Sequence, residues 1–256
     1  MKRPTQDIIN LLNEKADFYN HIDFIENDPI QIPHRFEIKQ DIEIAGFLSA
    51  SIAWGNRKAI IKNADFIMSL LEYSLYDFVL NFKESDLKSF PDKAAHRTFH
   101  MEDLKYFLKQ FQRIYLKHES LEDLFLLKDN ETNFYHAIER FRNTFIQEEH
   151  RAKKHLSSPY KNSASKRIMM FLRWMVREDN RGVDFGIWKN IDQKYLSIPL
   201  DVHTANISRK LNLVNRKQND WKTLEELDLV LRELNNNDPA VYDYALFGLG
   251  ISKEFE

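Results

Sequence analysis

The sequence predicts an all-α protein. Only 6 glycines and 7 prolines occur among its 256 residues, so the turn-forming residues that a many-stranded fold needs are scarce. Apolar residues recur at helical rather than alternating spacing through most of the chain. Hydrophobic residues make up 43% and charged residues 30%, which is the composition of a globular protein and not of a disordered one. A chain of this length can form one large domain or two lobes with a sizeable core.

Apolar periodicity and boundary signals place the expected elements along the chain. Breaks are predicted at Pro29 and Pro33, because the residue before a proline is driven out of the α region. Gly248 and Gly250 are expected to close the last helix. We expect helices over 5–25, 41–54, 57–82 (one long helix or a pair), 101–118, 131–149, 165–175, 202–212, 222–236 and 238–246, with a loop over 83–98 and an irregular insert over 178–198.

The composition also excludes several classes of site. There is no cysteine, so disulfides, thiolate zinc sites and iron–sulfur clusters cannot form. The chain has no signal-peptide pattern and no apolar run of bilayer length, and its charged, helical start predicts a cytoplasmic protein. His96 and His100 have a metal-ligand spacing if they lie on a helix, but no third ligand is evident. We therefore expect neither a metal nor a cofactor.

A basic stretch interrupts an otherwise acidic chain. The 37 Lys and Arg residues and 39 Asp and Glu residues give a formal net charge of −2. Residues 151–177 carry no acid, which leaves 29 bases and 39 acids, or −10, in the rest of the chain. A local basic patch of this kind suits phosphate binding, with a solvated charged face as the alternative. Its eight bases are Arg151, Lys153, Lys154, Lys161, Lys166, Arg167, Arg173 and Arg177.

Lys166 and Asp201 are the candidate catalytic residues. Lys166 falls in the first turn of a predicted helix beside Arg167 and Lys161, where the helix dipole and the neighbouring charges should lower the pKa of its amine. A neutral amine is what Schiff-base chemistry requires. Asp201 has the position of a helix N-cap, where backbone N–H groups keep a carboxylate ionised and able to stabilise a positively charged sugar carbon. From composition and spacing alone, a surface lysine and an ordinary cap remain the simpler interpretation.

Two segments resemble the helix-hairpin-helix DNA glycosylases, the superfamily of endonuclease III and 8-oxoguanine glycosylase. Ile198 to His203 resembles the segment in which a catalytic aspartate opens a helix. Ser165 to Phe171 resembles the helix start that carries the Schiff-base lysine in the archaeal 8-oxoguanine glycosylase branch, where the interval to the aspartate is long, as here. Leu48 to Ala50 resembles a helix end of endonuclease III, and Asp238 to Gly250 the closing helix. Overall the chain looks most similar to an uncharacterised bacterial family that itself resembles a divergent branch of these enzymes.

The resemblance implies a fold and an activity. The fold would be two interleaved helical lobes, a central barrel over 41–199 and a second lobe from 1–40 plus 200–256, with Lys166 and Asp201 facing each other across the cleft between them. The activity would be that of a DNA glycosylase with AP-lyase activity, which flips a damaged base such as an oxidised purine out of the duplex. DNA would be the partner, and the protein would act as a monomer without a cofactor.

The resemblance also implies DNA-contacting residues, with departures from the family pattern. The hairpin glycines that hold a phosphate are replaced by Pro159 to Ser163. Ser51 occupies the position of the side chain that wedges into DNA, and Asn56 or Arg57 could replace it. The residues expected to contact phosphates are Lys153, Lys154, Lys161, Arg167 and His203, and those expected near a flipped base are Trp174, Trp188, Trp221, Asp243 and Phe247.

Two alternative functions remain open at the level of sequence. The first is a helical nucleic-acid-binding protein that keeps the scaffold without the chemistry; it predicts salt-sensitive binding and no covalent trapping. The second is a protein-interaction module whose basic stretch is solvated or contacts an acidic partner. The absent hairpin glycines are compatible with both.

Overall fold

A computed structural model describes residues 3–252, and it confirms an all-α protein. The chain forms two compact units. Unit 1 comprises residues 1–24, 127–138 and 158–256, and unit 2 comprises residues 25–126 and 139–157. The bounds of these units are not those of the expected lobes: 25–40 belongs to unit 2, and 127–138 and 158–199 belong to unit 1. Residues 1–2 and 253–256 of the expected second lobe lie outside the described residues.

Unit 2 is built around a cluster of phenylalanines. The ring of Phe47 lies with its centroid 5.4–5.9 Å from those of Phe107, Phe111, Phe141 and Phe145. These rings come from α3, α7 and α8, so they join helices that are far apart in the sequence. The elements of unit 2 are η1 (Pro29–Gln31), η2 (Pro33–Arg35), α3 (Lys39–Ser51), α4 (Arg57–Leu70), α5 (Leu75–Asn81), α6 (Glu84–Lys88), β1 (Ala94–His96), β2 (Phe99–His100), α7 (Met101–Tyr115), η3 (Leu121–Leu124), most of α8 (Tyr135–Phe145) and η4 (Arg151–His155).

Two segments of unit 2 can be compared with the expectation from sequence, which left one helix or two open over 57–82 and a loop over 83–98. The run 57–82 is a helix pair, because Glu72 and Tyr73 take left-handed φ values of 56° and 53° and end the first helix. The segment 83–98 is not simply a loop. It contains α6 and the strand β1, which pairs antiparallel with β2. Helix and strand are too short here for a periodic pattern to identify them.

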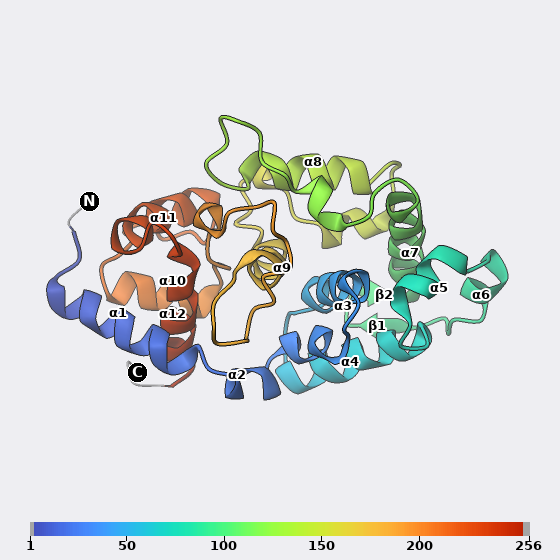
Figure 1. Cartoon of the computed structure of the whole chain (residues 1–256), viewed down its shortest axis with the longest axis horizontal. Coiled ribbons are helices and arrows are strands. Elements are labelled where there is room, and N and C mark those ends of the chain that lie inside the picture. Colours follow the sequence, from blue (N-terminus) through green and yellow to red (C-terminus); the bar gives the residue numbers. More distant parts are fainter. Residues whose placement is uncertain (1–2, 253–256) are drawn as a thin grey trace. The chain divides into compact units, whose positions relative to one another are not determined.

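Unit 1 gathers the terminal helices around α12. Helix α12 packs against both α1 and α10 (Figure 1). The elements are α1 (Gln6–Tyr19), the first half of α2 (Asp23–Glu26) at its boundary, η5 (Pro159–Lys161), α9 (Lys166–Val176), η6 (Gln193–Tyr195), α10 (Val202–Lys210), α11 (Trp221–Leu234), η7 (Pro239–Val241) and α12 (Tyr242–Ile251). No helix within residues 3–252 has the length and apolar character needed to cross a membrane.

Gly248 and Gly250 lie inside α12 and do not close it, contrary to the expectation from sequence. A Cβ at Gly248 would overlap the ring of Tyr19 on α1, and a Cβ at Gly250 would come within 2.9 Å of the Cβ of His203 on α10. The two glycines therefore allow α12 to approach both neighbouring helices closely.

We predict that Gly248→Ala destabilises unit 1. The methyl group would overlap ring atoms that cannot swing away without moving α1, and overpacking of this kind costs about 1–3 kcal/mol. Chemical denaturation followed by circular dichroism measures the change. Combining Gly248→Ala with Tyr19→Ala should recover part of the loss; strictly additive effects of the two substitutions would contradict the proposed overlap.

Candidate active site at the starts of α9 and α10

The structure brings Lys166 and Asp201 together, both within unit 1. Lys166 is the first residue of α9 and Asp201 is the N-cap of α10. The Lys166 Nζ atom lies 3.4 Å from Asp201 Oδ2. The lysine side chain is 36% exposed and the aspartate side chain 15%. The pair is thus accessible to a ligand on the lysine side while the carboxylate is largely enclosed.

The two oxygens of Asp201 have separate partners. Oδ1 accepts a hydrogen bond of 2.9 Å from the backbone N–H of Thr204, which is the N-cap interaction that opens α10. Oδ2 faces the amine of Lys166. The cap bond fixes the carboxylate plane, so the second oxygen is directed at the lysine without further ordering. A charged cap of this type is also favoured by the helix dipole.

The residue before Lys166 is in an unusual conformation. Ser165 is buried, has a left-handed φ of 49°, and makes no side-chain cap to α9. Its N–H donates to Ser163 Oγ at 3.1 Å. A non-glycine residue in this region costs about 1–2 kcal/mol, and such strain collects at functional sites. Asn162 is also left-handed, with φ of 62°. Conformations that glycine adopts readily are therefore present in the segment before Lys166, although it contains no glycine.

The segment before Lys166 is fastened to the start of α11. The carbonyl oxygen of Asn162 accepts from the N–H of Trp221 at 3.1 Å, and its Nδ2 donates to Asp220 Oδ2 at 2.9 Å. Burial would raise the pKa of Asp220, but hydrogen bonds from Thr223 and Arg216 lower it. An ionised Asp220 thus caps α11 and also holds the segment before Lys166 through Asn162. Sequence periodicity gave no sign of this contact, which joins residues 58 apart.

A buried ion network lies along α9 beyond Lys166. Arg173 contacts Asp184 at 3.2 Å and is paired with Asp243, while Arg177 contacts Asp184 at 3.1 Å and Asp238 at 2.9 Å. Both guanidinium groups lie against the ring of Tyr244, at 4.6 and 5.3 Å from its centroid. Burial raises the pKa of Asp243 to about 6; the carboxylates of Asp201 and Asp184 raise it as well, and Arg173 opposes them.

The network corrects the picture of a phosphate-binding stretch over 151–177. Arg173 and Arg177 are buried and satisfied by carboxylates, so they cannot contact a phosphate. Within unit 2, Arg151 pairs with Glu102 at 3.1 Å and Lys153 with Glu149 at 2.9 Å. Lys154 and Lys161 are exposed, and Arg167 is half-buried, with burial lowering its pKa.

Comparison with known proteins identifies a family. The sequence profile described as "Protein of unknown function (DUF2400)" matches residues 28–252. The chain belongs to this DUF2400 family. No curated protein and no solved structure matches the chain. The matched range includes both Lys166 and Asp201, together with the network that follows Lys166.

The residues expected near a flipped base are mostly in the core of unit 1. Trp174, Trp188 and Trp221 are all almost completely buried. Trp188 packs edge-on to Phe171 at 5.3 Å, and Trp221 donates its indole N–H to Glu225 at 3.0 Å. Phe247 is half-buried with its ring 6.1 Å from that of Phe24, and Asp243 is buried in its ion pair with Arg173. None of these three indoles presents an open face in this conformation, because each serves the packing of unit 1.

The remaining predicted contact residues are more scattered. Ser51 is buried at the end of α3, so it does not project as a wedge. Asn56 is exposed and caps α4 by accepting from the N–H of Ala59 at 3.1 Å, and Arg57 follows it as the first residue of that helix. His203 is exposed in the first turn of α10.

The two histidines at metal-ligand spacing lie on the strands β1 and β2 and not on a helix. His96 lies in β1, where its ring nitrogens hydrogen-bond to Asn63 at 2.8 Å and to the carbonyl of Trp54 at 2.9 Å. Across the described part of the chain, no group of at least three His, Asp or Glu side chains is arranged to hold a metal ion.

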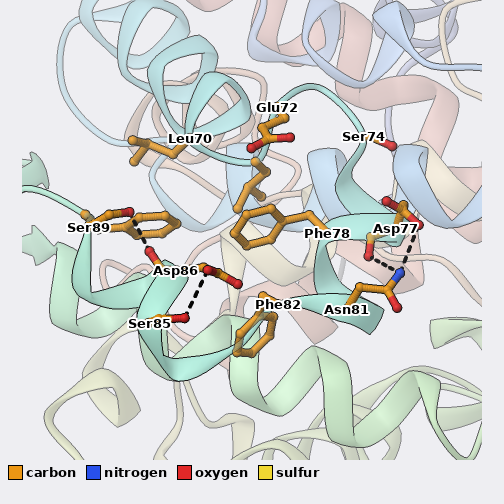
Figure 2. A pocket seen from close by; sticks show the side chains of 12 residues that line it. Leu70, Glu72, Ser74, Asp77, Phe78, Asn81, Phe82, Ser85, Asp86 and Ser89 are labelled. Atoms are coloured by element: carbon orange, nitrogen blue, oxygen red, sulfur yellow. Dashed lines mark hydrogen bonds between the residues drawn. The ribbon is translucent and has the colours of Figure 1, made fainter.

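Unit 2 contains a separate pocket between α4, α5 and α6, with a volume of about 480 Å³. Figure 2 shows Phe78 in the middle of its lining, with Glu72, Asp77 and Asp86 around it. No lysine or arginine lines this pocket, so it does not suit a phosphate. Asp86 accepts from the N–H of Lys83 at 2.7 Å, which is a helix cap. Figure 2 shows Asp77, which accepts from the side chain of Asn81 at 2.9 Å. Asp86 thus caps α6, and Asp77 bonds to a residue one turn further along α5.

Proposed function

We propose that the protein is a DNA glycosylase with lyase activity on a damaged base, in which Lys166 is the nucleophile and Asp201 its carboxylate partner. The observation that supports this proposal is the 3.4 Å approach of Lys166 Nζ to Asp201 Oδ2 at the starts of two helices, with the lysine side chain partly exposed and the carboxylate oriented by its cap bond. The resemblance of both helix starts to the glycosylase segments supports the same assignment.

The pair can carry the two steps that the reaction needs. Asp201 accepts a proton from the Lys166 ammonium, and the neutral amine attacks the C1′ carbon of a flipped nucleotide. The N–C1′ bond to the base breaks as the Nζ–C1′ bond forms, and the base leaves with its electron pair and takes up the proton that Asp201 holds, which restores the Asp201 carboxylate. Opening of the sugar gives a Schiff base, and removal of a C2′ proton then expels the 3′ phosphate by β-elimination. The Asp201 carboxylate stabilises the positive charge that develops on the sugar.

Borohydride trapping tests this function directly. Borohydride adds hydride to the Schiff-base carbon and leaves a permanent protein–DNA bond, so oligonucleotide duplexes carrying an abasic site or 8-oxoguanine should yield an adduct with the wild-type protein. Lys166→Gln should reduce the adduct below detection, because an amide cannot form an imine. The adduct is measured as a shifted band on a denaturing gel, and tryptic mass spectrometry places it on Lys166.

Lys194→Gln provides the matched control. Lys194 also pairs with an aspartate that caps a helix, at 2.9 Å from Asp192, and its side chain is 41% exposed. It should trap like the wild-type protein. Equal loss in both lysine variants would show that trapping is non-specific, and wild-type protein that binds both duplexes without any adduct would contradict the lyase assignment for these substrates.

A non-catalytic nucleic-acid-binding protein is the second candidate. It is favoured by the burial of Trp174, Trp188, Trp221 and Ser51, which leaves neither an open indole sandwich nor a projecting wedge for base extrusion. This candidate predicts salt-dependent DNA binding that Lys166→Gln changes little beyond the loss of one charge.

A further inference from the structure

Three aromatic rings in unit 1 lead from its core to its surface, and the outermost belongs to the segment that precedes Lys166 in the sequence. Trp221 is buried, and its ring centroid lies 5.0 Å from that of Tyr135. Tyr135 is half-buried, and its ring centroid lies 5.1 Å from that of Tyr160. Tyr160 is 56% exposed. Other large apolar side chains of the chain are also exposed, but Tyr160 is the outer end of a series of ring contacts that begins at the buried Trp221.

The exposed ring is held in place rather than free to move. Its hydroxyl hydrogen-bonds to His136 Nδ1 at 2.8 Å, and the imidazole lies edge-on to it at 5.7 Å. The backbone on either side is constrained, since η5 begins at Pro159 and Asn162 is tied to the start of α11. A ring that is already ordered loses little conformational entropy when a ligand stacks on it, so this arrangement is suited to binding.

A cation accompanies the ring. Lys161 follows Tyr160 directly, is exposed, and makes no ion pair with any residue that the structure describes. Lys153 in the same stretch is paired with Glu149, whereas the exposed Lys154, like Lys161, makes no ion pair within the described residues. A fixed aromatic face next to an unpaired ammonium is the combination that single-stranded nucleic acids select, because every base has a face to stack and every nucleotide a phosphate to neutralise.

We propose that Tyr160 and Lys161 form a stacking site for an unpaired nucleobase and its phosphate, on the segment that leads into Lys166. This inference rests on the proposed function insofar as DNA is the ligand. Backbone amides are the usual means by which a hairpin grips phosphate; Pro159 has no N–H to offer, and the aromatic ring supplies a different contact on the same segment. The stacking site would hold a nucleotide near the lesion, whose attacked sugar lies at Lys166.

Fluorescence anisotropy with a labelled single-stranded oligonucleotide and with a duplex containing an abasic site tests the stacking site. Tyr160→Ala should raise Kd on the order of 10-fold to 100-fold, the effect expected for one lost base–aromatic contact. The dependence of log Kd on log salt should stay unchanged, since no charge is removed. Tyr160→Phe keeps the ring and should bind within about 3-fold of wild type. Lys161→Gln should instead lower the salt slope by about 0.7–0.9.

Tyr73→Ala is the matched control. Tyr73 is also an exposed tyrosine, and its hydroxyl donates a hydrogen bond to Asp65 at 3.1 Å. It lies in unit 2, whereas the three rings described above lie in unit 1. It should leave Kd unchanged. Circular dichroism confirms that each variant is folded, and Tyr160→Ser serves as a second ring deletion.

The outcomes separate this inference from the proposed function. Wild-type protein that traps covalently but binds as well after Tyr160→Ala overturns the stacking site and leaves the glycosylase proposal intact. Tyr160-dependent binding without any borohydride adduct supports the stacking site and overturns the lyase. Failure of the wild-type protein to bind either DNA at low salt overturns both, and would favour a protein partner for the exposed ring.

Discussion

Arg177→Met is expected to lower the free energy of unfolding by about 3–5 kcal/mol, one of the two largest effects that we predict. Arg177 is almost completely buried and contacts three carboxylates, at 2.8 Å for Asp179, 3.1 Å for Asp184 and 2.9 Å for Asp238. Burial alone would lower the pKa of the guanidinium, but Asp184 and Asp238 raise it, so the group stays charged. Methionine fills much of the same space but leaves the carboxylates uncompensated.

The pH dependence of this loss identifies its cause. A buried carboxylate without its cation has a raised pKa and takes up a proton in the folded state. As the pH falls, this proton uptake stabilises the folded form of the variant, and its free energy of unfolding approaches that of the wild type. The difference in unfolding free energy between wild type and Arg177→Met should therefore be largest near pH 8 and shrink toward pH 4. Urea denaturation at several pH values measures this.

Lys189→Met is the control for the substitution itself. Lys189 pairs with Glu178 in the same unit, but both side chains are more than 60% exposed. Exposed ion pairs contribute at most about 1 kcal/mol, so this variant should unfold close to the wild type at every pH. A loss of under about 1 kcal/mol in Arg177→Met would show that the buried network is not needed to hold α9 in unit 1.

The sequence contained enough information for the fold class and for both helix starts. Scarce glycine and proline, together with helical periodicity, predicted the helices, and the cap signals located the beginnings of α9 and α10 at Lys166 and after Asp201. These features are local, since capping and apolar periodicity depend on residues within one or two turns. The same locality explains why the helix pair α4–α5 and the short elements between residues 84 and 100 were not resolved in advance.

Other parts of the site depend on contacts between distant residues, which periodicity does not record. Arg173 and Arg177 were counted among surface bases, yet their partners Asp184, Asp238 and Asp243 lie 7 to 70 residues away. The glycines of α12 were interpreted as a helix end because their packing partners are on α1 and α10. The left-handed turn at Asn162 does have a local signal in the sequence, since asparagine tolerates the left-handed region that a turn requires.

Asp201→Asn is the second large expected effect, and it separates the chemical role of Asp201 from its structural one. Asparagine is as good an N-cap as aspartate, so Oδ1 can still accept the 2.9 Å hydrogen bond from Thr204 and α10 should begin at the same residue. The change in stability should be under about 1 kcal/mol. What is lost is the negative charge 3.4 Å from the Lys166 amine, and with it the proton acceptor for that amine.

Removal of a general base typically slows a reaction by about 10²–10⁴-fold, so we expect the rate of borohydride adduct formation by Asp201→Asn to fall by that order under single-turnover conditions. Raising the pH should restore part of the rate, because solvent can then deprotonate the lysine in place of Asp201. Asp192→Asn removes the charge from another helix cap that pairs with a lysine, and should leave the rate unchanged. A wild-type rate in Asp201→Asn would mean that the carboxylate serves only to open α10, and that the amine of Lys166 loses its proton by another route.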